Sequence, residues 1–171
     1  MLGTANSPFR AGRSYPIGLG LCLLLGVLGC RRPASASVET GDSDEKVWGI
    51  SVGTELVFTP NRFVCTAGQK LRIVVRNTIP AAGPQISHSV VILQPNTEVD
   101  SFGRAALAAS PAEDYIPATF RARVLAHSHL VGPGQVEEIR LQAPAQPGTY
   151  PVVCAFPGHC MVGMTGELVV R

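Results

Sequence analysis

The sequence predicts an all-β protein, a sandwich of two sheets with one short helical insertion. From residue 47 onward the chain consists of short apolar runs separated by Gly and Pro, and the clearest run alternates apolar with charged side chains. Short strands punctuated in this way are typical of a β-sandwich. The expected strands are residues 55–59, 71–76, 86–93, 136–142, 149–154 and 167–170.

The run over residues 71–76 shows the alternation most clearly. Leu71, Ile73 and Val75 are apolar, whereas Arg72 and Arg76 are charged. Successive side chains of a strand point to opposite faces, so this strand is expected to bury one face and expose the other, as in an antiparallel sheet.

Residues 100–114 depart from the strand pattern. They contain the sequence RAALAASPAED, which is rich in Ala, the strongest helix former. We therefore expect a short helix or helical flap inserted between strands.

The N-terminus has the features of a signal peptide. Arg10 and Arg13 precede an apolar run at residues 17–28, which is too short to cross a bilayer as a mature helix. The run ends in VLGC, which resembles the lipobox of bacterial lipoproteins, whose cysteine is lipidated. Cys30 is therefore the predicted lipidation site, and the alternative is an ordinary signal peptide cleaved nearby.

Three segments follow from this interpretation. Residues 1–29 are the predicted lipoprotein signal peptide, and residues 30–46 are the lipidated cysteine with a flexible tether, because they are rich in Ser, Ala and charge without apolar periodicity. Residues 47–171 form the predicted domain. Removal of the signal peptide leaves 12 basic and 12 acidic residues, so no basic field for a nucleic-acid partner is implied.

The most informative sequence is YPVVCAFPGHCMVGMTGE, at residues 150–167. Cys154, His159 and Met164 place a thiolate, an imidazole and a thioether within eleven residues. These donors suit copper, and two histidines, a cysteine and a long axial methionine form the known electron-transfer arrangement. The second histidine should come from a distant rigid strand, and His88 has that setting.

These residues together resemble the azurin, auracyanin and plastocyanin family of blue copper proteins, the cupredoxins. The sequence CAFPGH at residues 154–159 is similar to the Cys-x-Phe-Pro-Gly-His loop of azurins, and residues 77–91 resemble the family's first ligand strand. The resemblance covers about residues 50–171. It implies a cupredoxin Greek-key β-sandwich. Three further segments resemble the azurin flap and the strand after it: residues 113–115, 123–127 and 132–134.

The resemblance also implies a ligand set for one type 1 copper ion. His88 Nδ1, Cys154 Sγ and His159 Nδ1 would lie in the trigonal plane, with Met164 Sδ as the axial ligand. Met164 follows His159 by five residues, as in plastocyanin-like and auracyanin-like loops, whereas Met161 is too close to fold back.

Two positions beside the ligands are also identified by the resemblance. Asn77 matches the family's loop-bracing Asn near the thiolate, and Ser89 stands where the family commonly has Asn after the first ligand. Hydrogen bonds around the ligands tune the redox potential, so the potential of this protein cannot be inferred from those of related proteins.

The remaining cysteines and histidines are expected to be structural. Cys65 lies at an alternating apolar position and is expected to be buried and not paired with Cys160. Cys160 leaves three interpretations: an alternative thiol ligand, a labile redox thiol, or a small residue that fills the loop, which we favour. His127 and His129 could form a second metal site, but no carboxylate or cysteine pair near them in the sequence completes it.

The sequence therefore predicts a one-electron carrier of the cell envelope and not an enzyme. A periplasmic copper carrier or storage protein that does not cycle its redox state is the alternative. A cupredoxin fold used only for binding or structure is less supported, because the four-ligand set is intact.

The expected partners follow from the anchor and the ligand loop. A lipid anchor at Cys30 would attach the protein to a membrane facing the periplasm, and the outer membrane is favoured because Arg31 is not an acidic inner-membrane retention signal. A cytochrome, an oxidase or a reductase would dock transiently at the exposed edge of His159. The apolar surface around that edge is formed by Pro157, Met161 and Val162.

Overall fold

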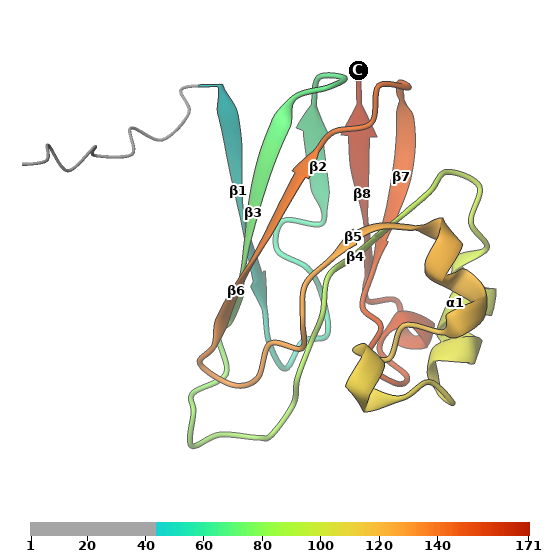
Figure 1. The fold of residues 1–171 in the computed structure, drawn as a ribbon. Helices are drawn as coiled ribbons and strands as arrows, with labels where there is room; N and C mark the ends of the chain where they lie inside the picture. Colours follow the sequence, from blue (N-terminus) through green and yellow to red (C-terminus); the bar gives the residue numbers. More distant parts are fainter. Residues whose placement is uncertain (1–43) are drawn as a thin grey trace, which may run out of the picture. The chain divides into compact units, whose positions relative to one another are not determined.

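The computed structural model describes residues 44–171, which form two β-sheets packed face to face (Figure 1). The predicted signal peptide, Cys30 and most of the predicted tether lie outside the described residues. Within residues 44–171, no helix is long and apolar enough to cross a membrane.

The first sheet has three strands in the order β1-β3-β6. β3 is central and runs parallel to β1 and antiparallel to β6. Glu45 and Lys46, expected in the tether, already belong to the first strand, so the sheet begins two residues before the expected domain boundary. The bounds are β1 (Glu45–Val52), β3 (Lys70–Asn77) and β6 (Val136–Gln142).

The alternation expected for residues 71–76 is confirmed in β3. Leu71, Ile73 and Val75 are buried between the sheets. On the outer face, Arg72 forms ion pairs with Glu45 at 3.4 Å and with Glu138 at 3.0 Å, so charges from all three strands meet there.

The second sheet has five strands in the order β2-β8-β7-β4-β5. Its first pair, β2 and β8, is parallel, and the other neighbours are antiparallel. The bounds are β2 (Arg62–Cys65), β4 (Val91–Leu93), β5 (Val124–His127), β7 (Gly148–Val153) and β8 (Thr165–Val170).

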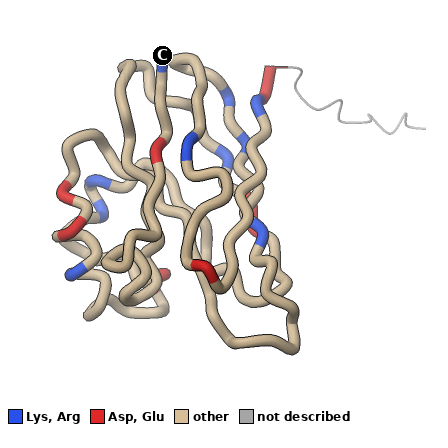
Figure 2. Tube along the Cα trace, turned by 180° about the vertical axis from the view of Figure 1, so that it is seen from behind, with Lys and Arg blue, Asp and Glu red and all other residues tan. Residues whose placement is uncertain are grey.

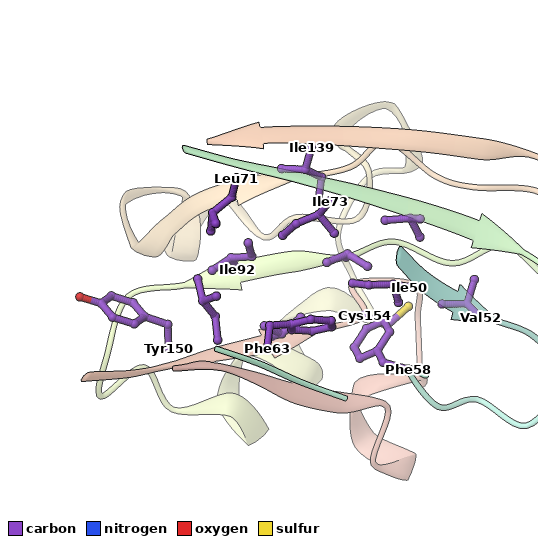
Figure 3. Close-up of a cluster of buried hydrophobic side chains, with 14 of the residues drawn as sticks. Ile50, Val52, Phe58, Phe63, Leu71, Ile73, Ile92, Ile139, Tyr150 and Cys154 are labelled. Carbon is purple, nitrogen blue, oxygen red and sulfur yellow. The ribbon is translucent and has the colours of Figure 1, made fainter. Parts of the chain in front are cut away.

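The facing sides of the two sheets supply the main hydrophobic core (Figure 3). Ile50, Ile73 and Ile139 of the first sheet point toward Phe63 and Ile92 of the second, and each of these side chains is at most 3% exposed. Burial of this apolar surface is the dominant force that holds the sheets together.

Two expected strands differ from the observed structure. Residues 55–59 do not form a strand, because a turn that bonds Leu56 N to Gly53 O reverses the chain, and only Thr59 pairs back to Ser51. Of the strand expected at residues 86–93, only Val91–Leu93 forms a β-strand, β4. Strands β1 and β2 were not among the expected runs.

The insertion expected at residues 100–114 lies between β4 and β5. The helix α1 (Val99–Ala106) is shorter than expected, because the chain turns before Ser110 and Pro111, and a residue before proline avoids the helical conformation. Two 3₁₀ helices follow, η1 (Pro111–Glu113) and η2 (Ala118–Arg123). We call residues 99–123 the flap.

The flap packs on the second sheet and closes a second hydrophobic cluster. Phe102 and Ala106 of α1 are buried against Val91, Leu93 and Val153. The helix therefore packs against β4 and β7, the strands next to the predicted ligands His88 and Cys154.

Asp114, which lies between η1 and η2 of the flap, contacts the segment after β5. Its carboxylate accepts a bond from Leu130 N at 3.2 Å and lies 2.8 Å from His129 Nδ1. The bond to Asp114 and the charges of Asp114 and Glu137 raise the pKa of His129 above 6.5.

We predict a pH-dependent contribution of the His129 contact to folding. Because the folded-state pKa is raised, the stabilisation is fully present below about pH 6.5 and is lost as the pH rises through the raised value. His129 is 77% exposed, so the difference should be about 0.5 kcal/mol. Urea unfolding of wild type and His129→Asn at about pH 5.5 and 8.5 measures it.

The matched control is His127→Asn, because His127 Nδ1 faces the backbone oxygen of Ser128 at 3.1 Å and not a carboxylate. An equal pH dependence in wild type and His129→Asn would contradict the role assigned to this contact.

Candidate metal centre

The four predicted ligands come from two segments at one end of the sandwich, the one before β4 and the connection between β7 and β8. His88 precedes β4, Cys154 directly follows β7, and His159 and Met164 lie in the loop between β7 and β8. Figure 1 shows this loop at the end opposite the C-terminus. His88, Cys154 and Met164 are fully buried, whereas His159 remains 8% exposed.

Three of these side chains bring their donor atoms together. The ligand atoms of His88, Cys154 and His159 lie within 4.8 Å of one another, and Cys154 Sγ is 3.5 Å from His159 Nδ1. Bonds of about 2.0 to 2.3 Å to one ion require donor atoms at about this separation. Among residues 44–171, no other group of three or more His, Cys, Asp or Glu is so placed.

His88 is held by its backbone and left unbonded at its ring. Its N–H and carbonyl pair with Val131 at 3.1 and 2.7 Å, but neither ring nitrogen has a hydrogen-bond partner. A buried polar group without a partner is costly. Burial, together with the proximity of His159, lowers the pKa of His88 to about 4. The ring is therefore a neutral donor at physiological pH, and a bound metal ion would satisfy it.

Cys154 is buried in the same way. Burial raises the pKa of its thiol to about 11, although Ser89 N–H donates to Sγ at 3.4 Å and favours the thiolate. The Ser89 hydroxyl accepts a bond from Ala155 N at 3.1 Å, so this residue also fixes the chain after the cysteine. At neutral pH a thiolate forms here only when a cation replaces the proton.

The loop that carries His159 and Met164 is held by its own backbone. Met164 N donates to His159 O at 3.0 Å, and Cys154 N donates to Met164 O at 3.2 Å. Gly158 and Gly163 turn the chain with φ of +87° and +94°, a conformation that favours glycine. The ring of Phe156 lies 4.6 Å from the His159 ring.

Asn77 braces the loop before His88. Its Nδ2 donates to Ile86 O at 2.9 Å and to Val131 O at 3.0 Å, and its Oδ1 accepts from Ile79 N at 3.1 Å. Since Val131 also pairs with the His88 backbone, Asn77 and His88 share one anchor.

Within residues 44–171, the two cysteines outside the cluster, Cys65 and Cys160, are free and buried, as expected for Cys65. Cys160 is 7% exposed and does not join the donor cluster, so its place in the structure fits a residue that fills the loop. Burial raises the pKa of the Cys160 thiol to about 11, with the charge of Asp100 acting in the same direction. Met161 is 54% exposed, in contrast to the buried Met164.

Two supporting contacts could not be found from the sequence. Val131 anchors both His88 and Asn77 through its carbonyl, and Tyr115 of the flap packs its ring edge-on to Phe156 at 5.5 Å. Each lies far along the chain from its partner, and an ordinary Val or Tyr carries no signal of such a contact.

The donor set fits copper. Cysteine thiolate, methionine thioether and neutral imidazole are soft or borderline ligands, whereas Mg²⁺ and Ca²⁺ require oxygen ligands. The unbonded His88 ring and the buried Cys154 thiol form a site prepared for such an ion.

The comparisons with known proteins agree with this geometry. Residues 45–171 match the family of copper binding proteins described as the plastocyanin/azurin family. The chain belongs to this family, and its cofactor is copper.

Auracyanins are among the relatives. Auracyanin-A of Chloroflexus aurantiacus is 32% identical over 121 residues, which is 71% of each chain. The solved structure of auracyanin A, titled a "blue" copper protein, superposes with a TM-score of 0.66 and 30% identity, over 74% of this chain and 99% of that one. The structure of dithionite-reduced auracyanin from Roseiflexus castenholzii superposes with a TM-score of 0.63 and 30% identity, over 77% of this chain and 99% of that one.

We predict that Asn77→Ala destabilises the fold by about 2 to 4 kcal/mol, because it removes three hydrogen bonds of a buried side chain, those to Ile86 O and Val131 O and that from Ile79 N. Denaturant unfolding of the metal-free protein measures the loss. Gln85→Ala, which removes an exposed bond in the same loop, should change stability by less than about 0.5 kcal/mol. Equal effects of the two substitutions would show that Asn77 is not a brace.

Proposed function

We propose that this protein is a one-electron carrier and not an enzyme, with its copper held by His88, Cys154, His159 and Met164. The convergence of three buried donors, one of them a histidine with neither ring nitrogen bonded, carries the proposal. Bound copper supplies one chemistry here, the exchange of a single electron between its Cu(II) and Cu(I) states.

The protein's part is to hold the ligands in place during that exchange. His88 is fixed by the Val131 pair, Cys154 by Ser89, and His159 by the backbone bond from Met164. Ligands fixed by independent elements resist rearrangement, so the energy of reorganisation for each transfer is kept small.

Electrons are proposed to enter and leave the copper site through His159. This histidine is 8% exposed, whereas His88 is completely buried. Met161 and Val162 beside it are 54% and 68% exposed. Lys, Arg, Asp and Glu are absent from residues 77–97, 124–136 and 141–166, which include every proposed ligand. Figure 2 shows charges mainly at the other end of the sheets and on the flap. A small docking surface with few charged side chains suits brief contact.

The location and the partners are proposals that rest on the sequence. A signal peptide and a lipid anchor at Cys30 would place the domain in the periplasm, on the outer membrane in preference to the inner. Its redox partners there would be a cytochrome, an oxidase or a reductase.

The Cu(II) spectrum of residues 31–171 tests the proposed site. We expect an intense thiolate-to-copper absorption band and a narrow copper hyperfine splitting in EPR, both lost in Cys154→Ser. Cys65→Ala is the matched control, because it removes another buried free thiol outside the donor cluster and should keep both features. A pale, ordinary Cu(II) spectrum in the wild type would reject the electron carrier in favour of copper handling.

A charge beside His159 should slow electron exchange. We predict that Val162→Asp lowers the rate of self-exchange between oxidised and reduced copies about tenfold or more at low salt, since two like charges meet in the encounter complex. NMR line broadening gives the rate, and the absorption spectrum should not change.

The control is Val47→Asp, because Val47 is 50% exposed near the start of β1, away from the ligand end. Wild-type exchange should depend little on ionic strength. An unchanged rate in Val162→Asp would rule out this docking surface.

A further inference from the structure

Helix α1 of the flap touches the copper-ligand loop at a glycine. Gly103 is buried in the middle of the helix. A Cβ built there would lie 3.2 Å from Cys160 Sγ, 3.3 Å from Cys160 Cβ and 3.3 Å from Met161 Cγ. These distances are tighter than nearly all real Cβ contacts, so a side chain at this position would require Cys160 or Met161 to shift by a few tenths of an ångström.

The glycine is not required by its backbone conformation. Gly103 is not among the residues with positive φ, and glycine inside a helix costs about 1 kcal/mol relative to alanine. Its benefit at this position is therefore the close approach of helix to loop.

On the side of the loop, Cys160 is the residue that packs against α1. Its side chain is 7% exposed and belongs to the cluster with Phe102 and Ala106 of α1. Its Sγ lies 3.7 Å from Val99 O, within range of a weak S–H bond to the first residue of the helix. The thiol therefore lies against two positions of α1 that are one turn apart, Val99 and Gly103.

The contact acts directly on a proposed ligand. Cys160 follows His159 in the chain and begins the 3₁₀ helix η3 (Cys160–Val162). Gly163 N donates to Cys160 O at 3.1 Å, and Met164 N donates to His159 O. A displacement of Cys160 would therefore move His159 and the chain that leads to Met164.

The helix in turn rests on the sheet that positions the other ligands. Phe102 and Ala106 pack in one cluster with Val91 and Val153, the latter immediately before Cys154. His88 and Cys154 are thus fixed by the sheet, and the His159 segment is fixed against the helix that this sheet carries.

We propose that Gly103 and Cys160 are positioning residues that set the place of His159 relative to His88 and Cys154. This inference rests on the copper site proposed above. It gives Cys160 a definite role: its small, buried thiol is a spacer between the flap and the ligand loop.

The test compares the copper spectrum and the midpoint potential of wild type, Gly103→Ala, Cys160→Ala and the double variant. Gly103→Ala should force Cys160 to shift, which changes the hyperfine splitting and the absorption maximum. The equilibrium constant for electron exchange with a redox dye should change by about twofold or more. The effect should be smaller in the Cys160→Ala background, where Sγ is absent.

Gly49→Ala is the matched control, because a Cβ at this β1 position meets nothing within 4 Å. It should leave the spectrum and the potential unchanged. If Gly103→Ala does not fold, Cys160→Ala alone still tests the inference, since it removes the contact without overpacking.

The outcomes separate the two proposals. A wild-type protein without the intense copper band would reject the copper site itself. A wild type with the band, together with folded Gly103→Ala and Cys160→Ala variants whose spectra and potentials equal those of the wild type, would overturn the positioning role alone.

Discussion

The desolvation of the donor atoms is the constraint on which this structure depends. An imidazole and a thiol have been taken from water, and the imidazole has no hydrogen bond in return. Such groups stay in place only if the surrounding fold holds them. The paired sheets, the Asn77 brace and the Ser89 bonds supply that support. Together they hold the buried donor atoms where a single ion can bind them.

The ligands differ in how they are held, and the difference matches their roles. His88 and Cys154 are tied to strands deep in the sandwich. His159 belongs to a loop that reaches the surface and depends on the flap for its support. The ligand proposed to meet a partner is therefore also the one that an inserted element places.

Local patterns in the sequence were enough to predict much of this. The alternation from Leu71 to Val75 located a central strand, and the CAFPGH motif located most of the site. The edge strands β1 and β2 were missed for other reasons: a glycine interrupts the alternation of Trp48, Ile50 and Val52 in β1, β2 has only 4 residues, and pairing with distant strands stabilises both. The contacts of Val131 and of Gly103 were missed because they join residues far apart in the chain. Contacts of this kind depend on the tertiary fold.

The place where β1 begins has a practical consequence. Glu45 pairs with Lys70 at the end of the sandwich that also holds the C-terminus, and the strand then runs toward the ligand end over about 25 Å. A domain grafted to a solid support through its N-terminal side would turn its redox-active end outward. The same geometry suits an electrode coating, in which dissolved molecules reach the metal without crossing the attachment layer.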